Sequence, residues 1–332
     1  MLTKQDDLIH APTGDALWRE SHFWNFFDHQ SKFGGYFSIG KRPAKGNSGY
    51  ILFLLGEKDI CLYGVEYDKF EKHTNEWKVD GLSYECVTPM ETWKVAFDGE
   101  LVDFGQSPLR ISRAEMKPVA KSERKKEKVE FNLVFEALDA PFQYSLDSPK
   151  AKDFFDRNYY ELIGTYKGTL KIGAEEYNLD AFGVKNHVWG IRNWFAPEKW
   201  RWASIWLNSG EMFIGIYKIT VPGTVVTDGY VFRGGKIYRL SEVEEEITLK
   251  EVADSPKTLP LACNFKLKDE GGFELDIEGK VLKVVPTVFE KSIEENRKLL
   301  SWNDRCTVEY RSSQGDIGYG ELEVSDRLVL QR

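Results

Sequence analysis

The sequence has little of several features that would narrow its function at once. Four cysteines occur among 332 residues, Cys61, Cys86, Cys263 and Cys306, with no close metal-type pairing. We therefore expect reduced, partly buried thiols rather than a disulfide framework. No apolar run approaches the roughly 20 residues that span a bilayer, and none follows the polar start Met1-Leu2-Thr3-Lys4. These absences predict a cytoplasmic protein without a secretory signal or a transmembrane segment.

Motifs of several common enzyme classes are also missing. The chain has no Gly-x-Ser-x-Gly elbow, no phosphate-binding Gly-Lys-Ser/Thr loop and no dinucleotide fingerprint. Its five histidines, His10, His22, His29, His73 and His187, form no close pair except the loosely spaced His22 and His29, so we expect no metal site. The net charge is −8 and no broad basic surface is evident, which argues against nucleic acid as a partner.

What the chain does have is the composition of a folded protein with two domains. Hydrophobic residues make up 42% and aromatic residues 14%. A length of 332 residues is comfortable for two domains. A loop-like stretch near residue 140 precedes a tryptophan-rich block, so we place an N-terminal domain at residues 1–175 and a C-terminal domain, with that block, at residues 176–332.

The recurring local pattern is alternation of apolar and polar residues, broken by turn residues. Only residues 148–155 and 292–300 suggest short helices. The sequence therefore predicts an all-β fold of antiparallel strands, either a sandwich or a closed barrel. The expected hairpins turn at Asp98-Gly99, Asn208-Ser209-Gly210, Gly234-Gly235 and Gln314-Gly315-Asp316.

Half of the ten tryptophans lie between Trp189 and Trp206. They begin inside a run, residues 183–194, that also contains one histidine, one amide next to it and one arginine. Large rings with one polar tip suit a deep, mostly apolar pocket that needs a few hydrogen bonds.

The run from Asp180 to Trp194 resembles the Asp-His-Ser-Trp-Gly signature of the AttH/CrtC-like tandem-lipocalin superfamily, which includes carotenoid 1,2-hydratases, tocopherol-cyclase-like proteins and fungal Diels–Alderases. Trp18-Arg19-Glu20-Ser21, Tyr160-Glu161 and the closing Gly318-Tyr319-Gly320 agree with it. The resemblance implies two lipocalin-like β-barrels or half-barrels in tandem, a ligand in one barrel or between them, and no cofactor.

Two departures from that pattern concern the reaction. The aspartate that precedes the histidine in the family is Asn186 here, and the residue after the histidine is Val188. The counterpart of a downstream Tyr-x-Asp is Tyr217-Lys218-Ile219, which has no carboxylate. The resemblance therefore speaks against carotenoid hydration in particular and leaves the fold untouched.

Within the motif we expect His187, Asn186 and Glu161 to be catalytic. A histidine exchanges protons near neutral pH, and beside an amide it is expected to be neutral. Its alternative role is a buried histidine that ties two strands together. Glu20, Glu161 and Asp180 are candidate general acids, because a carboxyl in an apolar cavity has a raised pKa. Each could instead be a surface or salt-bridged carboxylate.

The expected substrate-binding residues are mostly aromatic. Indole faces can wall a pocket and stabilise a carbocation, although core packing explains them equally well. An arginine here stacks on an indole or pairs with Glu161, or it is a structural clamp. The set comprises Glu20, Trp189, Arg192, Trp194, Trp206 and Tyr217.

These observations predict a cofactor-independent enzyme of the lyase or isomerase type. It would cyclise, hydrate or isomerise a hydrophobic isoprenoid or polyene. The alternatives are a barrel that carries a lipid without changing it, and an interaction protein without a deep cavity. The partner is a hydrophobic small molecule, and the sequence leaves open whether the chain is a monomer or a homodimer.

Overall fold

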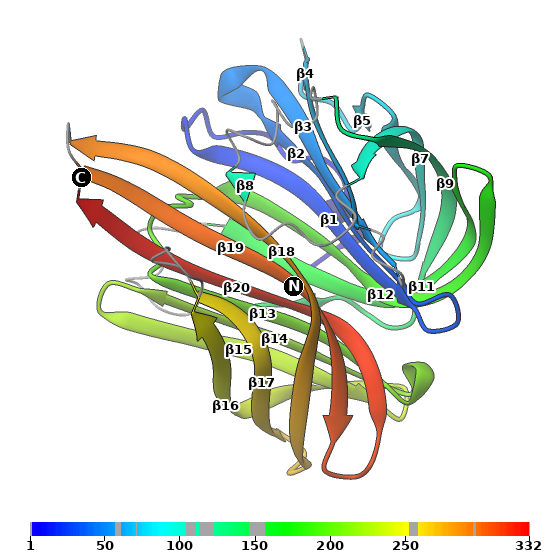
Figure 1. Ribbon diagram of the computed structural model, residues 1–332, viewed down its shortest axis with the longest axis vertical. Coiled ribbons are helices and arrows are strands. Elements are labelled where there is room, and N and C mark those ends of the chain that lie inside the picture. Colours follow the sequence, from blue (N-terminus) through cyan, green and yellow to red (C-terminus); the bar gives the residue numbers. More distant parts are fainter. Residues whose placement is uncertain are drawn as a thin grey trace. The chain divides into compact units, whose positions relative to one another are not determined.

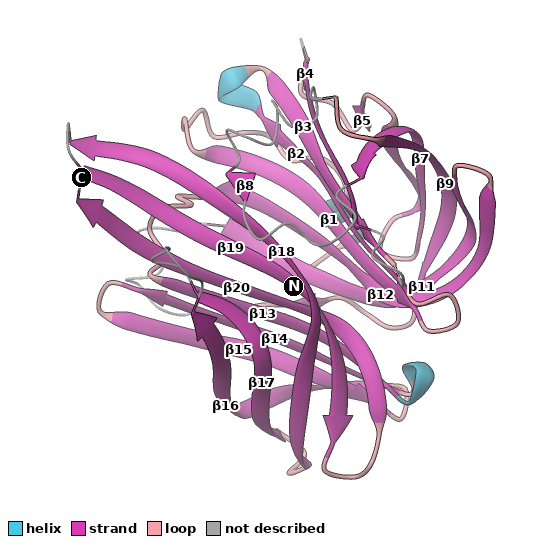
Figure 2. Ribbon diagram, in the orientation of Figure 1, coloured by secondary structure: helices cyan, strands magenta, loops and turns pink. Residues whose placement is uncertain are grey.

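The computed structural model describes residues 2–56, 61–70, 72–103, 111–112, 123–145, 157–251, 258–294 and 297–331. Strands dominate these residues, as Figure 2 shows, and the all-β prediction is confirmed. The helical segments among them are short 3-10 turns, η1 (Lys4–Asp7), η2 (Pro43–Lys45) and η3 (Asn208–Gly210). In this part of the chain no helix is long and apolar enough to cross a membrane.

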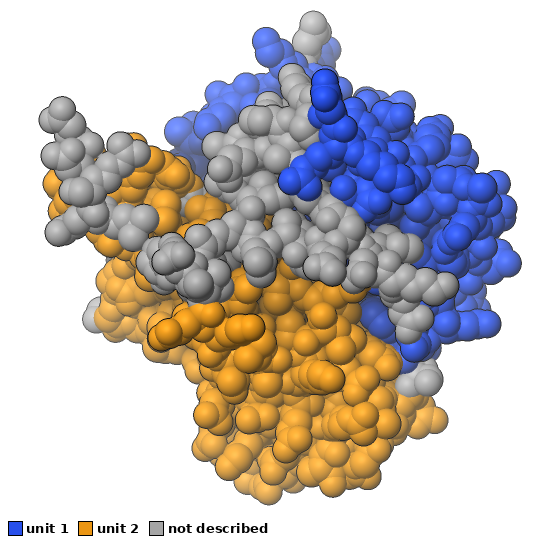
Figure 3. Space-filling view, viewed as in Figure 1, with its two compact units in different colours: residues 1–106, 116–144, 152–193 blue, residues 107–115, 145–151, 194–332 orange. Residues whose placement is uncertain are grey.

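The chain divides into two compact units, coloured separately in Figure 3. Unit 1 comprises Met1–Gln106, Met116–Tyr144 and Lys152–Asn193, and unit 2 comprises Ser107–Glu115, Ser145–Ala151 and Trp194–Arg332. The sequence-based boundary at residues 175 and 176 therefore differs from this division. The strand with the His187 motif lies in unit 1, because it pairs with the first strand of the chain.

Unit 1 is one antiparallel sheet that closes on itself. Successive pairings run β1–β2–β3–β4–β7–β9–β11–β12 and return from β12 to β1 (Figure 1). Closure leaves few free edges and makes every second residue point inward. The strands of unit 1 are β1 (Trp18–Asp28), β2 (Phe33–Arg42), β3 (Asn47–Leu55), β4 (Cys61–Lys69), β5 (Trp77–Val79), β6 (Leu82–Thr88), β7 (Thr92–Asp103), β9 (Lys126–Ala137), β10 (Phe142–Gln143), β11 (Arg157–Ile172) and β12 (Glu175–Ile191).

Unit 2 repeats this plan with a second antiparallel sheet. Its order is β17–β16–β15–β14–β13–β20–β19–β18, and a pairing of β17 with β18 closes the ring, while the short β8 adds a parallel edge to β18. Its strands are β8 (Ile111–Ser112), β13 (Lys199–Leu207), β14 (Met212–Val221), β15 (Thr224–Arg233), β16 (Lys236–Glu251), β17 (Thr258–Asp269), β18 (Glu274–Glu294), β19 (Arg297–Ser312) and β20 (Ile317–Gln331).

Three of the four predicted hairpins are confirmed. The β15–β16 hairpin turns at Gly234 and Gly235, both with positive φ, as a tight two-residue turn requires. The β13–β14 and β19–β20 hairpins also turn where expected.

The predicted hairpin at Asp98-Gly99 is wrong, because β7 runs straight through both residues. They stay extended and pair with Glu130 and Val129 of β9. The missing side chain of Gly99 leaves room for the ring of Phe97, whose nearest atom would lie 2.7 Å from an added Cβ.

Helix was also predicted at residues 292–300, and there the structure has strands. Residues up to Glu294 belong to β18 and those from Arg297 to β19, so cross-strand pairing overrides the local helical tendency. The other predicted helix, residues 148–155, lies outside the described residues. Cys86, Cys263 and Cys306 are free thiols, as expected.

Close approach of β1 and β12 depends on Gly183. A Cβ at this position would lie 1.9 Å from the carbonyl oxygen of Asn25, a backbone atom that cannot turn aside. We expect Gly183→Ala to lower the free energy of unfolding by about 1–3 kcal/mol, since the strands must separate. Urea unfolding measures this loss.

The control for Gly183→Ala is Gly14→Ala. Gly14 has a φ of +86° and no heavy atom within 4 Å of an added Cβ, so its substitution reports backbone strain without a clash. A Gly183→Ala variant that unfolds like the wild type would show that the two strands tolerate a wider spacing.

Candidate functional site

The interior of unit 1 contains polar side chains at adjacent positions of β1 and β12. Alternation points Glu20, His22 and Trp24 of β1 inward, and their cross-strand partners are Trp189, His187 and Lys185 of β12. The side chains of Glu20, His22, Lys185 and His187 are fully buried. Buried polar groups at this density require partners, so their contacts define the site.

One carboxylate, that of Glu20, brings three histidines together. Its Oε1 lies 2.8 Å from Nδ1 of His10 and 2.9 Å from Nε2 of His187. Its Oε2 lies 3.2 Å from Nε2 of His73, and the backbone N–H of His10 donates to both oxygens. His10 and His73 are 19% and 10% exposed, so the cluster reaches the surface through them.

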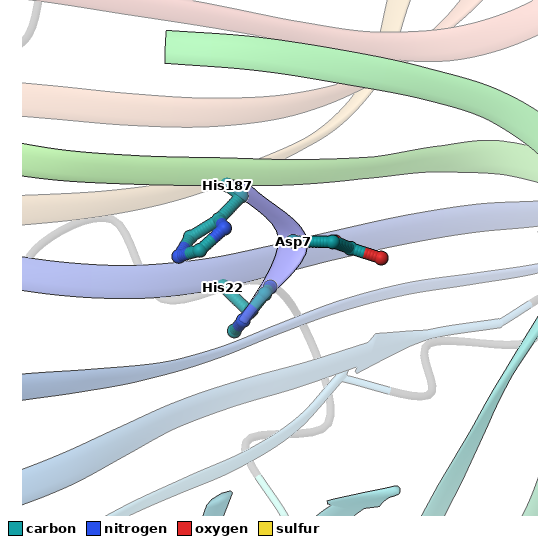
Figure 4. Close-up of side chains that lie close together, drawn as sticks. All are labelled: Asp7, His22 and His187. Carbon is teal, nitrogen blue, oxygen red and sulfur yellow. The ribbon is translucent and has the colours of Figure 1, made fainter. Parts of the chain in front are cut away.

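Aromatic rings surround these groups. The ring of His22 stacks on that of His187 at 4.0 Å, and the ring of His10 stacks on Trp189 at 3.8 Å. Trp77 meets His22 edge-on at 4.4 Å. Figure 4 shows the imidazoles of His22 and His187 beside one another and Asp7, the last residue of η1, close to them. The polar cluster therefore lies inside an apolar, aromatic wall.

A second network, centred on Asp7, holds the N-terminal segment against this interior. The Asp7 carboxylate forms a fully buried ion pair with Lys185 and accepts hydrogen bonds from the hydroxyl of Tyr160 and the backbone N–H of Met90. The indole N–H of Trp93 donates to it at 2.9 Å. With these donors the carboxylate is saturated, and Lys185 has its countercharge.

Burial and these contacts set the charge states. Burial would raise the pKa of Asp7, but Lys185 outweighs it and lowers the pKa to about 2. Burial likewise opposes the ionisation of Glu20, yet its hydrogen bonds with the histidines hold the pKa of Glu20 well below its usual range. Burial lowers the pKa of His22 and of His187, in the latter case against the attraction of Glu20. At neutral pH the carboxylates of Asp7 and Glu20 are therefore ionised, and burial favours the neutral imidazole at His22 and His187.

The depressed pKa of Asp7 predicts a pH dependence of stability. The folded-state pKa of about 2 is below the ordinary 3.8, so the contribution is complete above about pH 4 and is lost as the pH falls toward 2. Its size is on the order of 2 kcal/mol. We expect the difference in unfolding free energy between wild type and Asp7→Asn to shrink across this range in urea titrations. The exposed Asp180→Asn is the control, and a constant difference for Asp7→Asn would contradict the prediction.

Two groups in this cluster have metal-ligand composition. They are Asp7 with His22 and His187, and His10 with Glu20 and His187, and within each group the ligand atoms all lie within 4.8 Å of one another. The expectation that the histidines do not cluster is therefore wrong. Sequence spacing failed because the pairing of β1 with β12 joins residues more than 150 positions apart.

The predicted catalytic residues do not meet at one point. His187 faces the interior of unit 1, whereas Asn186 and Glu161 are cross-strand partners on the opposite face of β12 and β11. There Glu161 is buried and accepts hydrogen bonds from Tyr144 and Tyr159 at 3.3 and 3.4 Å. Neighbouring residues of a strand point to opposite faces, so Asn186 and Glu161 lie on the other face of the sheet from the side chain of His187.

The predicted binding residues are likewise dispersed. Glu20 and Trp189 line the interior of unit 1, whereas Arg192 donates to Ser21 on the outer side of the sheet. Asp180, a candidate acid, is exposed.

The remaining three predicted binding residues belong to unit 2. Trp194 stacks on Trp200 at 5.8 Å, Tyr217 meets Trp200 edge-on, and Trp206 packs against Phe213. None of the three belongs to the unit 1 interior.

The sequence analysis missed His10, His22, His73, Asp7 and Lys185 as site residues. A signal existed for two of them, since His22 and Lys185 share the inward phase of Glu20 and His187. Asp7, His10 and His73 lie outside the strands, so no periodicity marks them.

Solved structures of similar fold cover nearly the whole chain. A protein described as AttH from Nitrosomonas europaea has a TM-score of 0.66 and 11% identity over 98% of this chain and 96% of that one. CghA with Sch210972 has a TM-score of 0.64 and 10% identity, covering 97% and 94%. Kievitone hydratase from Nectria haematococca has a TM-score of 0.54 and 13% identity, also covering 97% and 94%.

The two closed sheets and these likenesses define the class as the tandem lipocalin-like fold of AttH-like proteins, which confirms the predicted resemblance and architecture. The chain belongs to the family described as a domain of unknown function, DUF7064, whose model matches residues 3–328. No curated protein matches the sequence.

Proposed function

We propose that this protein is an enzyme of the lyase or isomerase type that acts on a hydrophobic small molecule of the isoprenoid or polyene class. The reaction is a cyclisation, hydration or isomerisation, and proton transfer takes place at His187 in the interior of unit 1. The observation that carries the proposal is the 2.9 Å contact of His187 with Glu20 inside an aromatic wall.

The geometry supports a definite role for each nitrogen of His187. Its Nδ1 lies 3.0 Å from the carbonyl oxygen of Asp6, which only accepts, so Nδ1 carries a hydrogen. Its Nε2 is then the atom that takes or gives the proton, and Glu20 stabilises the imidazolium that forms. The ring centroids of Trp189 and Trp77 lie 4.9 and 6.3 Å from that of His187, and indole rings attract positive charge that develops nearby on a substrate.

The other predicted site residues have separate places in this proposal. The side chains of Asn186 and Glu161 lie on the opposite face of the sheet from that of His187. In this proposal they hold β12 in place and do not touch the substrate. Support for an enzyme also comes from the relatives, because one similar structure is named a hydratase. In line with the sequence analysis, the proposed proton transfer needs no cofactor.

The second candidate function is that of a carrier that binds the same class of molecule without changing it. His187 is completely buried and the Asp7–Lys185 pair is saturated, so the interior is rigid. A rigid interior favours binding without chemical change.

Native mass spectrometry of the purified protein, followed by organic extraction, tests the proposal. We expect a bound terpene-like compound and, on incubation with terpenes and polyenes, a product of equal mass or of mass changed by one water. Retention of such compounds without any product would support the carrier. A protein that binds none of them would overturn both.

A further inference from the structure

Three donor atoms of the unit 1 interior converge in a way that acid–base chemistry alone does not require. Nδ1 of His10 and Nε2 of His187 lie 2.8 and 2.9 Å from the same oxygen, Oε1 of Glu20. Ligand atoms of these residues all lie within 4.8 Å of one another. The edges of a tetrahedron around Zn²⁺ are about 3.3 Å for bonds of 2.0–2.1 Å, so small movements of the side chains bring all three into bonding distance.

The hydrogen bonds of His187 orient it as metal-binding histidines are oriented. Nδ1 faces the carbonyl oxygen of Asp6 at 3.0 Å, so Nε2 is the nitrogen that faces Glu20, at 2.9 Å. A proton or a metal ion between Nε2 and Oε1 satisfies both atoms, and the convergence of a second imidazole, that of His10, on the same oxygen favours a metal ion. A backbone carbonyl on the remote ring nitrogen is the usual support of a metal-binding histidine.

Neighbouring groups complete this arrangement. His73 holds the second oxygen of Glu20 through Nε2 at 3.2 Å, which fixes the orientation of the carboxylate. His22 is fully buried against His187, and within the described residues neither of its ring nitrogens has a hydrogen-bond partner. An imidazole buried with two unpaired nitrogens is costly and indicates a further polar ligand beside His187.

The alternative group, Asp7 with His22 and His187, is the weaker candidate. The carboxylate of Asp7 already accepts from Lys185, Tyr160, Trp93 and the backbone of Met90, and an ion would have to replace the Lys185 ammonium there. Glu20 has only histidines as side-chain partners among the described contacts, and each can rotate from hydrogen bonding to ligation.

We propose that His10, Glu20 and His187 bind one divalent transition-metal ion, of which Zn²⁺ is the one to test. Two imidazoles and one carboxylate form a donor set that suits zinc and leaves a fourth position open. The ion enters past His10, because this side chain is partly exposed.

This inference goes beyond the proposed function and is tested separately from it, because both use Nε2 of His187. An ion on Nε2 of His187 occupies the electron pair that would otherwise take a proton, so zinc would suppress the proposed proton transfer. The site can bind metal without any turnover, and turnover can exist without metal binding, so each proposal fails on its own measurement.

The test is Zn²⁺ titration of chelator-treated full-length protein in a calorimeter, together with Co²⁺ absorption spectra that report four-coordinate geometry. We expect saturation at one equivalent and visible bands typical of tetrahedral Co²⁺. Glu20→Gln and His10→Gln should each weaken zinc affinity by more than about 100-fold, since second-shell changes alone cost about 10–100-fold. His73→Gln should fall within that second-shell range.

His29→Gln is the matched control, because His29 lies beyond the end of β1 and outside the cluster. Its zinc affinity should equal that of the wild type. Far-UV circular dichroism checks each variant, and if Glu20→Gln does not fold, the partly exposed His10→Gln decides. A wild type that binds no zinc, or a folded His10→Gln that binds it unchanged, overturns the proposal.

Discussion

Replacing Lys185 with methionine should lower the free energy of unfolding by about 3–5 kcal/mol. Both charges of the Asp7–Lys185 pair are fully buried. Without the ammonium, the Asp7 carboxylate keeps only its neutral donors and stays in an interior that solvates charge poorly. Urea unfolding followed by circular dichroism measures the loss.

An exposed lysine provides the control for this experiment. Lys171 pairs with Glu176 at 3.3 Å, but both side chains are about half exposed, so Lys171→Met should cost less than about 1 kcal/mol. The double variant Asp7→Asn/Lys185→Met removes both charges of this pair and should recover part of the loss. If Lys185→Met costs no more than Lys171→Met, water reaches the pair and the interior is not closed.

The second large effect concerns catalysis. We expect His187→Ala to reduce kcat by about 10²–10⁴-fold on any hydrophobic substrate that the wild type converts, because positioned acid–base groups contribute that much. Ligand affinity should change only a few-fold, because the aromatic wall remains. The measurement is steady-state kinetics together with fluorescence titration of the ligand.

Two variants make this result specific. Glu20→Gln keeps the shape of the side chain but no longer stabilises an imidazolium, so it should lower kcat and alter its pH profile. His29→Ala, outside the cluster, should leave kcat unchanged. A His187→Ala enzyme with wild-type turnover would remove His187 from the mechanism and shift attention to the Glu161 side of the sheet.

Local pattern was enough to predict an all-β chain, and the family resemblance added the two lipocalin-like barrels. Alternation and paired glycines identify strands and turns because both depend on neighbouring residues, as Gly234 and Gly235 show. The same rule failed at Asp98-Gly99, where pairing of β7 with β9 keeps the chain extended. Turn residues show that a segment can form a turn, and pairing with distant strands determines whether it does.

The site was less accessible to prediction for a similar reason. The motif identified His187, but its partners are more than 150 residues earlier in the sequence. Only the register of β1 against β12 places His22 opposite His187. Asn186 was predicted as the neighbour of His187 and Glu161 as a candidate acid, yet strand alternation turns both to the other face. A single sequence gives the phase of each strand and not the register between strands.

The pairing of β1 with β12 also has a consequence for how the protein is made. β1 cannot pair along its full length with β12 until Ile191 has been synthesised. Asp7 likewise has no ion pair until Lys185 has been synthesised. During that interval one edge of β1 has no neighbour in the sheet, which invites pairing with other chains. We therefore expect nascent chains that stop before β12 to aggregate or to recruit chaperones, and chains released after it to stay dispersed.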